Sequence, residues 1–330
     1  MRSSSDMSVA LSIAGTAAWL DERDDYLILT HRRPDGDTVG CAGALAQGLR
    51  EHGKTVYVLR NPEITPRYER FIEDYYAPDG YAQRCVIIID TASRDLFPIN
   101  GTEYAGAVSL CIDHHPSNTG FAEYSYIDSS SASCGEIIYE ILFELTGGIS
   151  AITAGCLYVA LTTDTGCFEF ANTTAKTLRI ASLLVDAGAP QKDLNRMLFR
   201  TKTRGRIKIE GMIYTGLEFY IDGMVAISTI TRDMIDEAGA DEDDMDDISS
   251  IPSAVEGVLV GFTIREMKSS QDCKVSVRSS PLVNSNAICE RFGGGGHPMA
   301  AGFTQEASAA EIKASLLEIV GEYLPVIGSR

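Results

Sequence analysis

Short, almost continuously apolar segments alternate with helical patterns along the first half of this chain. A strand with one wet face alternates apolar and polar residues, so continuous apolar runs indicate parallel strands buried on both faces. Four segments have this character: 26–30, 55–59, 85–89 and 108–112. Helical patterns cover 39–52, 137–145, 151–161 and 173–187, and Ser133 with Glu136 forms a capping-box pattern ahead of the second. The alternation predicts an α/β domain with a mainly parallel sheet covered by helices.

The pattern changes after about residue 190. Residues 201–206 are basic and polar and are typical of a linker. Asp222-Gly223 lies between two apolar runs, which predicts a hairpin. Further strands are expected at 257–264 and 274–277, and helices at 286–292 and 308–323. We therefore expect three parts: a domain over 1–190, a linker over 191–215 and a smaller α+β domain over 216–330.

Composition limits the partners and the compartment. The chain has 28 Lys and Arg against 46 Asp and Glu, a formal net charge of −18, which disfavours binding of long duplex nucleic acid. Eight cysteines without a CxxC pair are too few for a disulfide scaffold and indicate buried thiols in a reducing cytoplasm. The sequence contains no run of about 20 apolar residues, so no membrane span is predicted. Residues 8–20 fit a first helix better than a signal peptide, and the acidic run 241–247 fits a solvated loop.

Histidines and aspartates gather where the predicted strands end. His31, Asp35 and Asp37 follow the first strand, Asp90 follows the third, and Asp113-His114-His115 follows the fourth. Each cluster alone fits a polar turn or a helix cap equally well. Three strands that deliver such groups to one sheet edge, where open α/β sheets bind ligands, indicate a shared site. Asp164, after an apolar helical run, is a further candidate.

Carboxylates crowded together repel one another unless cations lie among them. Aspartate and histidine without cysteine suit Mn²⁺, Mg²⁺ or Fe²⁺ better than a structural zinc site. A set of this size, with one bridging carboxylate, can hold two ions, and two-metal sites hydrolyse phosphate esters.

A glycine run near the end of the chain offers a second kind of site. Gly293 to Gly296 precede His297, and apolar residues lie on both sides. Backbone N–H groups of Gly294, Gly295 and Gly296 can approach an anion closely, and a flexible linker is the alternative. Arg278, followed by Ser279 at the end of a predicted strand, offers a bidentate partner for phosphate, or is an exposed strand-end arginine.

These motifs resemble those of the DHH/DHHA1 phosphoesterases, over nearly the whole chain. The family's four metal motifs match His31-x-x-Pro34-Asp35-Gly36-Asp37, then Asp90, then Asp113-His114-His115, then Asp164. The glycine-histidine motif of the DHHA1 substrate domain matches residues 293–302. The resemblance implies an N-terminal DHH domain, a C-terminal DHHA1 domain and an active-site cleft between them.

The resemblance also implies roles for individual residues. His31 and Asp35 would bind one metal, and Asp37, His114 and Asp164 the other, with Asp90 bridging both. His115 would touch the phosphate or support the ligands, and Asp113 would orient the histidines. Substrate binding would fall to Arg278, Ser279, Gly294, Gly295, Gly296 and His297. The family usually uses Mn²⁺, so two Mn²⁺ ions are the expected cofactors, with Mg²⁺ or Fe²⁺ as alternatives.

Within the family, the two-domain form is similar to the nanoRNase/pAp-phosphatase group. That similarity implies hydrolysis of short oligoribonucleotides to mononucleotides, of adenosine 3′,5′-bisphosphate to AMP, or of both, with short RNA or nucleotides as partners. Alternatives are hydrolysis of linear or cyclic dinucleotides such as pApA and cyclic di-AMP, exonuclease action on longer single strands, and non-catalytic nucleotide binding. No membrane partner is expected. The sequence leaves the oligomeric state open, and a twofold homodimer is the commonest soluble oligomer.

Overall fold

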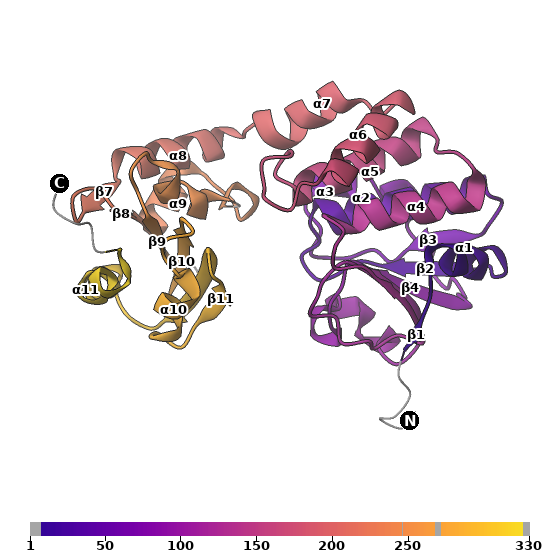
Figure 1. Cartoon of the computed structure of the whole chain (residues 1–330), viewed down its shortest axis with the longest axis horizontal. Helices are drawn as coiled ribbons and strands as arrows, with labels where there is room; N and C mark the ends of the chain where they lie inside the picture. Colours follow the sequence, from indigo (N-terminus) through magenta and orange to yellow (C-terminus); the bar gives the residue numbers. More distant parts are fainter. Residues whose placement is uncertain (1–7, 246, 268–271, 326–330) are drawn as a thin grey trace. The chain divides into compact units, whose positions relative to one another are not determined.

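The computed structural model describes residues 8–245, 247–267 and 272–325 and divides the chain into two compact units, Met1–Thr201 and Lys202–Arg330. Each unit has a sheet of its own (Figure 1). The first sheet has six strands in the order β1-β6-β5-β4-β2-β3, and all of its pairings are parallel. Its strands are β1 Val9–Ala10, β2 Tyr26–Leu29, β3 Val56–Val58, β4 Cys85–Ile89, β5 Val108–Asp113 and β6 Tyr124–Ile127. The mainly parallel sheet expected from the four apolar runs is confirmed, and β1 and β6 are additional edge-side strands.

Helices cover one face of this sheet. Figure 1 shows α2, α4 and α5 side by side above β2, β3 and β4. The helices of the first unit are α1 Ile13–Asp21, α2 Gly36–Glu51, α3 Pro66–Glu69, α4 Cys134–Thr146, α5 Ala151–Asp164, α6 Ala175–Asp186 and α7 Gln191–Asn195. The opposite face packs against short 3₁₀ turns and loops, through Phe97 and Tyr104 among others. The α2 and α5 backbones meet closely, because a Cβ on Gly40 would lie 2.5 Å from the Cys156 carbonyl oxygen. The start of α2 also lies against the end of α5, because a Cβ on Gly36 would be 2.4 Å from the Thr163 side chain.

The prediction of a capping box at the start of α4 is wrong. Ser133 is the N-cap residue, but its side chain makes no capping hydrogen bond, and Glu136 instead accepts from the Thr177 hydroxyl at 2.5 Å. The cap comes from another helix: Asp37 of α2 accepts the N–H of Cys134 at 2.7 Å and of Gly135 at 3.1 Å. A carboxylate is a stronger acceptor than a hydroxyl at a positive helix end, so a residue far away in sequence replaces the local cap.

The segment expected to link the domains is largely helical. It contains α7, a π-helical turn at Arg196–Arg200 and α8 Arg204–Thr215, and the division between the units falls after Thr201. Thr203 caps α8, and its hydroxyl also donates to Asp244 at 2.6 Å. Asp244 lies in the acidic run and is buried, so the interpretation of that run as a wholly solvated loop is wrong at this residue. The basic and acidic stretches that the sequence separates are thus packed together.

The second unit is a mixed sheet with helices. Its order is β11-β12-β10-β9-β8-β7, with β8 and β9 parallel and the other pairs antiparallel. The elements are β7 Glu218–Tyr220, β8 Val225–Ile230, α9 Arg232–Ala238, β9 Val260–Glu266, β10 Cys273–Ser279, α10 Ser285–Glu290, β11 Gly295–His297, β12 Ala300–Gln305 and α11 Ala309–Val320. The β7–β8 hairpin around Asp222-Gly223 is confirmed. The glycine run is no linker, because part of it forms the edge strand β11.

Two expectations from composition can be compared with the structure. All eight cysteines are free thiols, and all but Cys167 are buried. Among the described residues, no helix combines the length and the hydropathy needed to cross a bilayer.

Candidate metal centre

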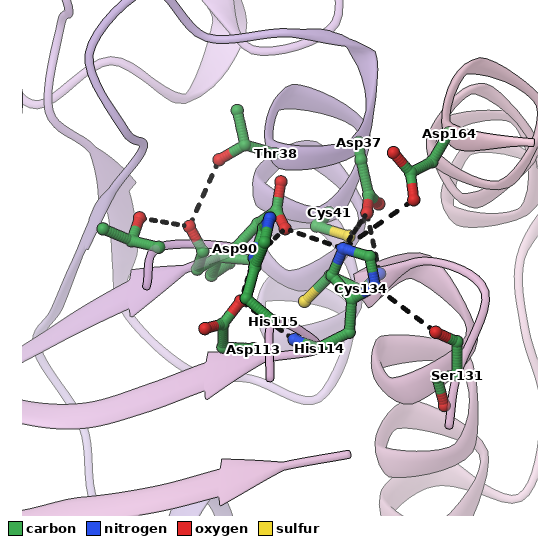
Figure 2. A network of polar contacts seen from close by, with 12 residues as sticks. Asp37, Thr38, Cys41, Asp90, Asp113, His114, His115, Ser131, Cys134 and Asp164 are labelled. Carbon is green, nitrogen blue, oxygen red and sulfur yellow. Dashed lines mark hydrogen bonds and ion pairs between the residues drawn. The ribbon is translucent and has the colours of Figure 1, made fainter. Parts of the chain in front are cut away.

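Eight histidine and aspartate side chains of the first unit meet at the carboxyl edge of its sheet. His31 follows β2, Asp90 follows β4 and Asp113 ends β5, while Asp35 is the N-cap of α2 and Asp164 is the last residue of α5. Figure 2 shows Asp37, Asp90, His114 and Asp164 directed toward one another. Three groups have ligand atoms within 4.8 Å of one another: His31–Asp35–Asp90, Asp37–His114–Asp164 and Asp90–His114–His115. The structure therefore brings together every residue for which the sequence suggested a metal.

Asp90 is shared between two of these groups. Its Oδ2 lies 3.8 Å from His31 Nε2, and its Oδ1 lies 3.4 Å from His114 Nε2. The residue is only 3% exposed, and Oδ1 accepts no hydrogen bond although it is buried. A buried carboxylate oxygen without a hydrogen bond is costly unless a cation meets it. The two oxygens of Asp90 thus face two separate donor sets.

The backbone fixes which imidazole nitrogen each histidine turns to the carboxylates. His31 Nδ1 lies 2.7 Å from the Arg32 carbonyl oxygen, and His114 Nδ1 lies 3.3 Å from that of Ser131. Since a carbonyl can only accept, Nδ1 carries the proton in both rings. Nε2 is then the nitrogen that can bind a cation once it loses its own proton, as is common for metal-ligating histidines. The role of the Ser131 carbonyl has no signature in the sequence.

His115 lies in one of the three donor groups and is also part of a supporting network. Its Nδ1 donates to Asp113 Oδ1 at 2.7 Å, and Asn118 Nδ2 donates to Asp113 Oδ2 at 2.6 Å. Asp113 is fully buried, whereas the His115 side chain is 42% exposed. Sequence analysis predicted Asp113 as an orienting group but missed Asn118. An asparagine five residues after the motif is an ordinary turn residue, so its sequence position alone carried no signal.

Two further supports hold the ligands from outside the cluster. The Asp37 carboxylate accepts the first N–H groups of α4, as described above, and the Cys41 thiol lies 3.3 Å from Asp37 Oδ1. Asn172 Nδ2 donates to the backbone oxygens of Asp164, at 3.0 Å, and Ala132, at 2.9 Å. Sequence analysis singled out neither Cys41 nor Asn172, because their partners are distant in the chain or are backbone atoms.

The crowded carboxylates shift the protonation of the whole cluster. Burial acts to lower the pKa of His114, but contact with Asp90 and the charges of Asp37, Asp90 and Asp164 outweigh it and raise the pKa to about 10. Burial likewise opposes, and the nearby Asp35 and Asp90 carboxylates favour, protonation of His31, whose pKa is raised to about 9.

The aspartates respond differently: the pKa values of Asp37 and Asp164 are raised, whereas for Asp35 burial is outweighed by contact with His31 and by backbone hydrogen bonds, which lower its pKa. Burial, followed by the charges of Asp90 and Asp164, holds the pKa of Asp37 well above its usual range. Burial raises the pKa of Asp164 to about 6, although His114 pulls against it. Protons therefore partly neutralise the negative charge among the protein's own groups, and divalent cations would compete with them for the same positions.

The donor set fits hard or intermediate divalent ions. It consists of carboxylate oxygens and imidazole nitrogens, and burial raises the pKa values of the nearby Cys41 and Cys134 thiols, which keeps them protonated. Oxygen- and nitrogen-rich sites suit Mn²⁺, Mg²⁺ and Fe²⁺. The orphaned Asp90 Oδ1 supplies a position that a cation would satisfy.

The substrate-site candidates lie together in the second unit. Arg278 of β10 and His297 of β11 both pair with Ala300 of β12, so all three lie in one row across the sheet. Their neighbours Val277 and Ala301 are buried in the core, which places Arg278 and His297 on the opposite face.

The remaining candidates of this unit shape the same region. The Gly296 N–H donates to Asn286 Oδ1 at 2.7 Å, and Gly294 lies against the Gly302 carbonyl oxygen. Ser279 Oγ donates to the Val283 carbonyl oxygen at 2.6 Å and accepts from Ser285 Oγ at 2.8 Å. The Ser279 hydroxyl therefore has partners within the unit, and Asn286 is a contact that sequence analysis did not single out.

Two family models match the chain, one in each of its two units. The model of the DHH family N-terminal domain matches residues 25–161, and that of the DHHA1 domain matches residues 222–324. A Thermus thermophilus protein named bifunctional oligoribonuclease and PAP phosphatase NrnA is 32% identical over 281 residues, covering 84% of this chain and 83% of that protein. The chain belongs to the DHH family.

Two other proteins are similar over most of their length. The Bacillus subtilis protein of the same name is 27% identical over 288 residues, which cover 84% of this DHH family chain and 88% of the relative. The crystal structure of an exopolyphosphatase-related protein from Bacteroides fragilis superposes with a TM-score of 0.83 at 21% identity, covering 94% of this chain and 96% of that one. This likeness shows that the chain and the Bacteroides fragilis protein share a fold.

The raised pKa values of His31 and His114 imply that divalent ions would compete with protons for these two imidazoles. A group whose pKa is raised loses its proton only as the pH approaches that raised value, so Mn²⁺ affinity should rise from pH 6 to about 9. Calorimetry in buffers of different ionisation enthalpy measures the protons released per ion. We expect net release at pH 7, a smaller release in His31→Gln, and no change in His52→Gln, whose imidazole lies outside the site. Affinity that is constant over this pH range would contradict the proton competition.

Proposed function

We propose that this chain is a divalent-metal-dependent phosphoesterase that hydrolyses short oligoribonucleotides to mononucleotides and adenosine 3′,5′-bisphosphate to AMP. The observation that carries the proposal is the pair of donor groups that share buried Asp90. The names of the Thermus thermophilus and Bacillus subtilis relatives state both activities for those proteins. Ligand chemistry and relatives therefore point to the same reaction class.

The donor groups suggest how two ions would be held. His31 and Asp35 would bind one ion, Asp37, His114 and Asp164 the other, and Asp90 would contribute one oxygen to each. Mn²⁺ is the proposed ion because the set mixes imidazole with carboxylate, and Mg²⁺ or Fe²⁺ are alternatives. Such ions, when bound, offset the charge that develops on phosphoryl oxygens and acidify a bound water.

His115 is the proposed group for direct contact with the substrate phosphate. Its Nδ1 donates to buried Asp113, which holds the ring, and 42% of the His115 side chain is exposed. The same hydrogen bond, more than the opposing effect of burial, raises the pKa of His115 and favours the cation. A positively charged imidazole can donate a proton or a hydrogen bond to a phosphoryl or leaving-group oxygen. Asn118 secures the other oxygen of Asp113 and so acts through it.

The second unit is the proposed holder of the nucleotide end of the substrate. Arg278 offers a planar cation suited to phosphate, and His297 lies in the same row of the sheet. Gly294, Gly295 and Gly296 complete the proposed surface as residues without side chains that a ligand can approach closely, because the N–H groups of Gly294 and Gly296 already donate to the Cys289 carbonyl oxygen and to Asn286 Oδ1. Ser279 supports the end of β10. Binding through the Arg278 and His297 side chains suits a short anionic ligand.

The test of this function is a length series of RNA from two to about 20 nucleotides, together with adenosine 3′,5′-bisphosphate, pApA and cyclic di-AMP. We expect Mn²⁺-dependent release of mononucleotides from the shortest RNAs and of phosphate from the bisphosphate, with activity falling as length increases. Activity that rises toward 20 nucleotides would instead support a single-strand exonuclease. Binding of these nucleotides without any hydrolysis would support a non-catalytic regulator.

Matched carboxylate variants tie the activity to the proposed centre. Asp90→Asn should reduce turnover on the order of 10³-fold or more, because one acceptor of both donor groups is lost. Asp95→Asn, a carboxylate change in a 3₁₀ turn outside the cluster, should retain wild-type turnover. Mn²⁺ should raise the thermal midpoint of the wild type and of D95N but not of D90N. Near-wild-type turnover in D90N would refute the shared-carboxylate site.

Variants of the second unit separate binding from chemistry. Arg278→Ala and His297→Ala should each raise KM about tenfold or more with a smaller change in kcat, since loss of a charged hydrogen bond costs about 1.5–3 kcal/mol. Lys274→Ala is the matched control, because Lys274 lies on the same strand and face as Arg278. An unchanged KM in H297A would remove His297 from the substrate site.

We also propose that the protein works in the cytoplasm as a homodimer. Eight free thiols fit a reducing compartment. The exposed side of α6 carries Leu178 and Leu183, with Arg179 in its first half and Asp186 at its end, so two antiparallel copies would match apolar residues and opposite charges. Light scattering should give twice the chain mass for the wild type and the single mass for Leu178→Glu/Leu183→Glu. A monomeric wild type would contradict the proposal.

A further inference from the structure

An aromatic ring is held in solvent beside the candidate metal centre. Phe170 is 56% exposed. Its ring lies directly against Gly166, because a Cβ built on that glycine would be 2.5 Å from one ring carbon and 2.6 Å from the next. Gly166 is two residues after Asp164, so their Cα atoms are at most about 7.6 Å apart. The ring therefore lies against the backbone that directly follows Asp164.

The loop that carries Phe170 is fixed rather than loose. The Phe170 N–H donates to the Thr165 carbonyl oxygen at 3.0 Å, and Asn172 ties the loop to Asp164 and to Ala132, ahead of α4. The backbones of Cys167 and Phe168 both have positive φ angles, 57° and 72°, which residues other than glycine rarely adopt. Such strain persists only where surrounding contacts enforce it, and it gathers at functional sites.

The two phenylalanines of this loop have opposite surroundings. Phe168 packs toward the core, with its ring edge-on to Tyr158 at a centroid distance of 6.3 Å. Phe170 turns away from the core and leaves its ring open to solvent. The loop is thus already anchored by Phe168, and burial does not explain why the residue at 170 is aromatic.

We propose that Phe170 is a stacking platform for the nucleobase of the nucleotide whose phosphate lies at the metal centre. An exposed ring on a rigid loop binds a base face without ordering cost, and every base has such a face, so stacking adds affinity with little sequence preference. The inference rests on the proposed function, and it adds to it that the substrate is recognised by its base as well as by its phosphate. Phe170 is accordingly a substrate-binding residue and takes no part in bond breaking.

Kinetics of matched phenylalanine variants test the platform. Phe170→Ala should raise KM for pApA about tenfold with kcat within about twofold, as expected for loss of one base–aromatic stack. Phe170→Tyr and Phe170→Trp should stay near wild type, because they keep a flat ring. The control is Phe143→Ala, which removes the 50% exposed phenylalanine near the far end of α4 and should change neither constant. An unchanged KM in F170A, or a large loss of kcat, would overturn the inference.

Competition experiments ask whether the effect belongs to the base. AMP and ribose 5-phosphate share the phosphate and sugar, but only AMP carries a base. F170A should weaken inhibition by AMP about tenfold and leave inhibition by ribose 5-phosphate unchanged. Equal weakening of both would show a structural effect on the metal centre and refute stacking.

A binding signal independent of turnover separates this inference from the proposed function. The F170W variant adds an exposed indole to a chain whose single tryptophan, Trp19, is buried. AMP should quench the added fluorescence, and ribose 5-phosphate should not. Quenching by AMP without hydrolysis of any nucleotide by the wild type would retain the platform and refute the phosphoesterase. Hydrolysis by the wild type without quenching of F170W by AMP would retain the phosphoesterase and refute the platform.

Discussion

Repulsion among carboxylates at one edge of the parallel sheet is the constraint on which the rest of the first unit depends. Asp37 and Asp90 are almost completely buried, and Asp164 is close enough to influence both. No arrangement of backbone donors alone neutralises this charge, so protons or divalent ions must do so. The nearby carboxylates outweigh burial and raise the pKa values of His31 and His114, which favours the positively charged imidazoles.

The same demand explains how the supporting groups are arranged. Carbonyl oxygens hold His31 and His114 by Nδ1, so that Nε2 faces the acids in both. Asp113, by contrast, is satisfied by Asn118 and by the nearby His115, whose side chain is partly exposed. Both oxygens of Asp113 are thus occupied by side chains of the protein, whereas Asp37 accepts backbone N–H groups and still faces His114. Asp90 Oδ1, which accepts no hydrogen bond, is the clearest ligand of the cluster.

Much of this arrangement could be predicted from sequence because it follows from strand ends. Continuous apolar runs located β2, β3, β4 and β5, and the residues after three of these strands reach one edge whatever the details of the loops. Short edge pieces such as β1, two residues long, carry too little pattern to be recognised. Contacts between distant residues were also out of reach. The Ser133–Glu136 pattern looked locally complete, yet Asp37, 97 residues before Cys134, supplies the cap of α4. Asp244 was misassigned for a similar reason, since its partner Thr203 precedes it by 41 residues.

The double use of Asp37 has a consequence for how such a protein can diverge. His31 and Asp164 serve the centre alone, so a descendant that abandoned catalysis could exchange them freely. Asp37 also completes the first turn of α4, and replacing it would leave two buried amide groups without an acceptor. A lineage that lost the chemistry should therefore retain this one aspartate long after its neighbours had drifted, and its presence alone is no sign of an active enzyme.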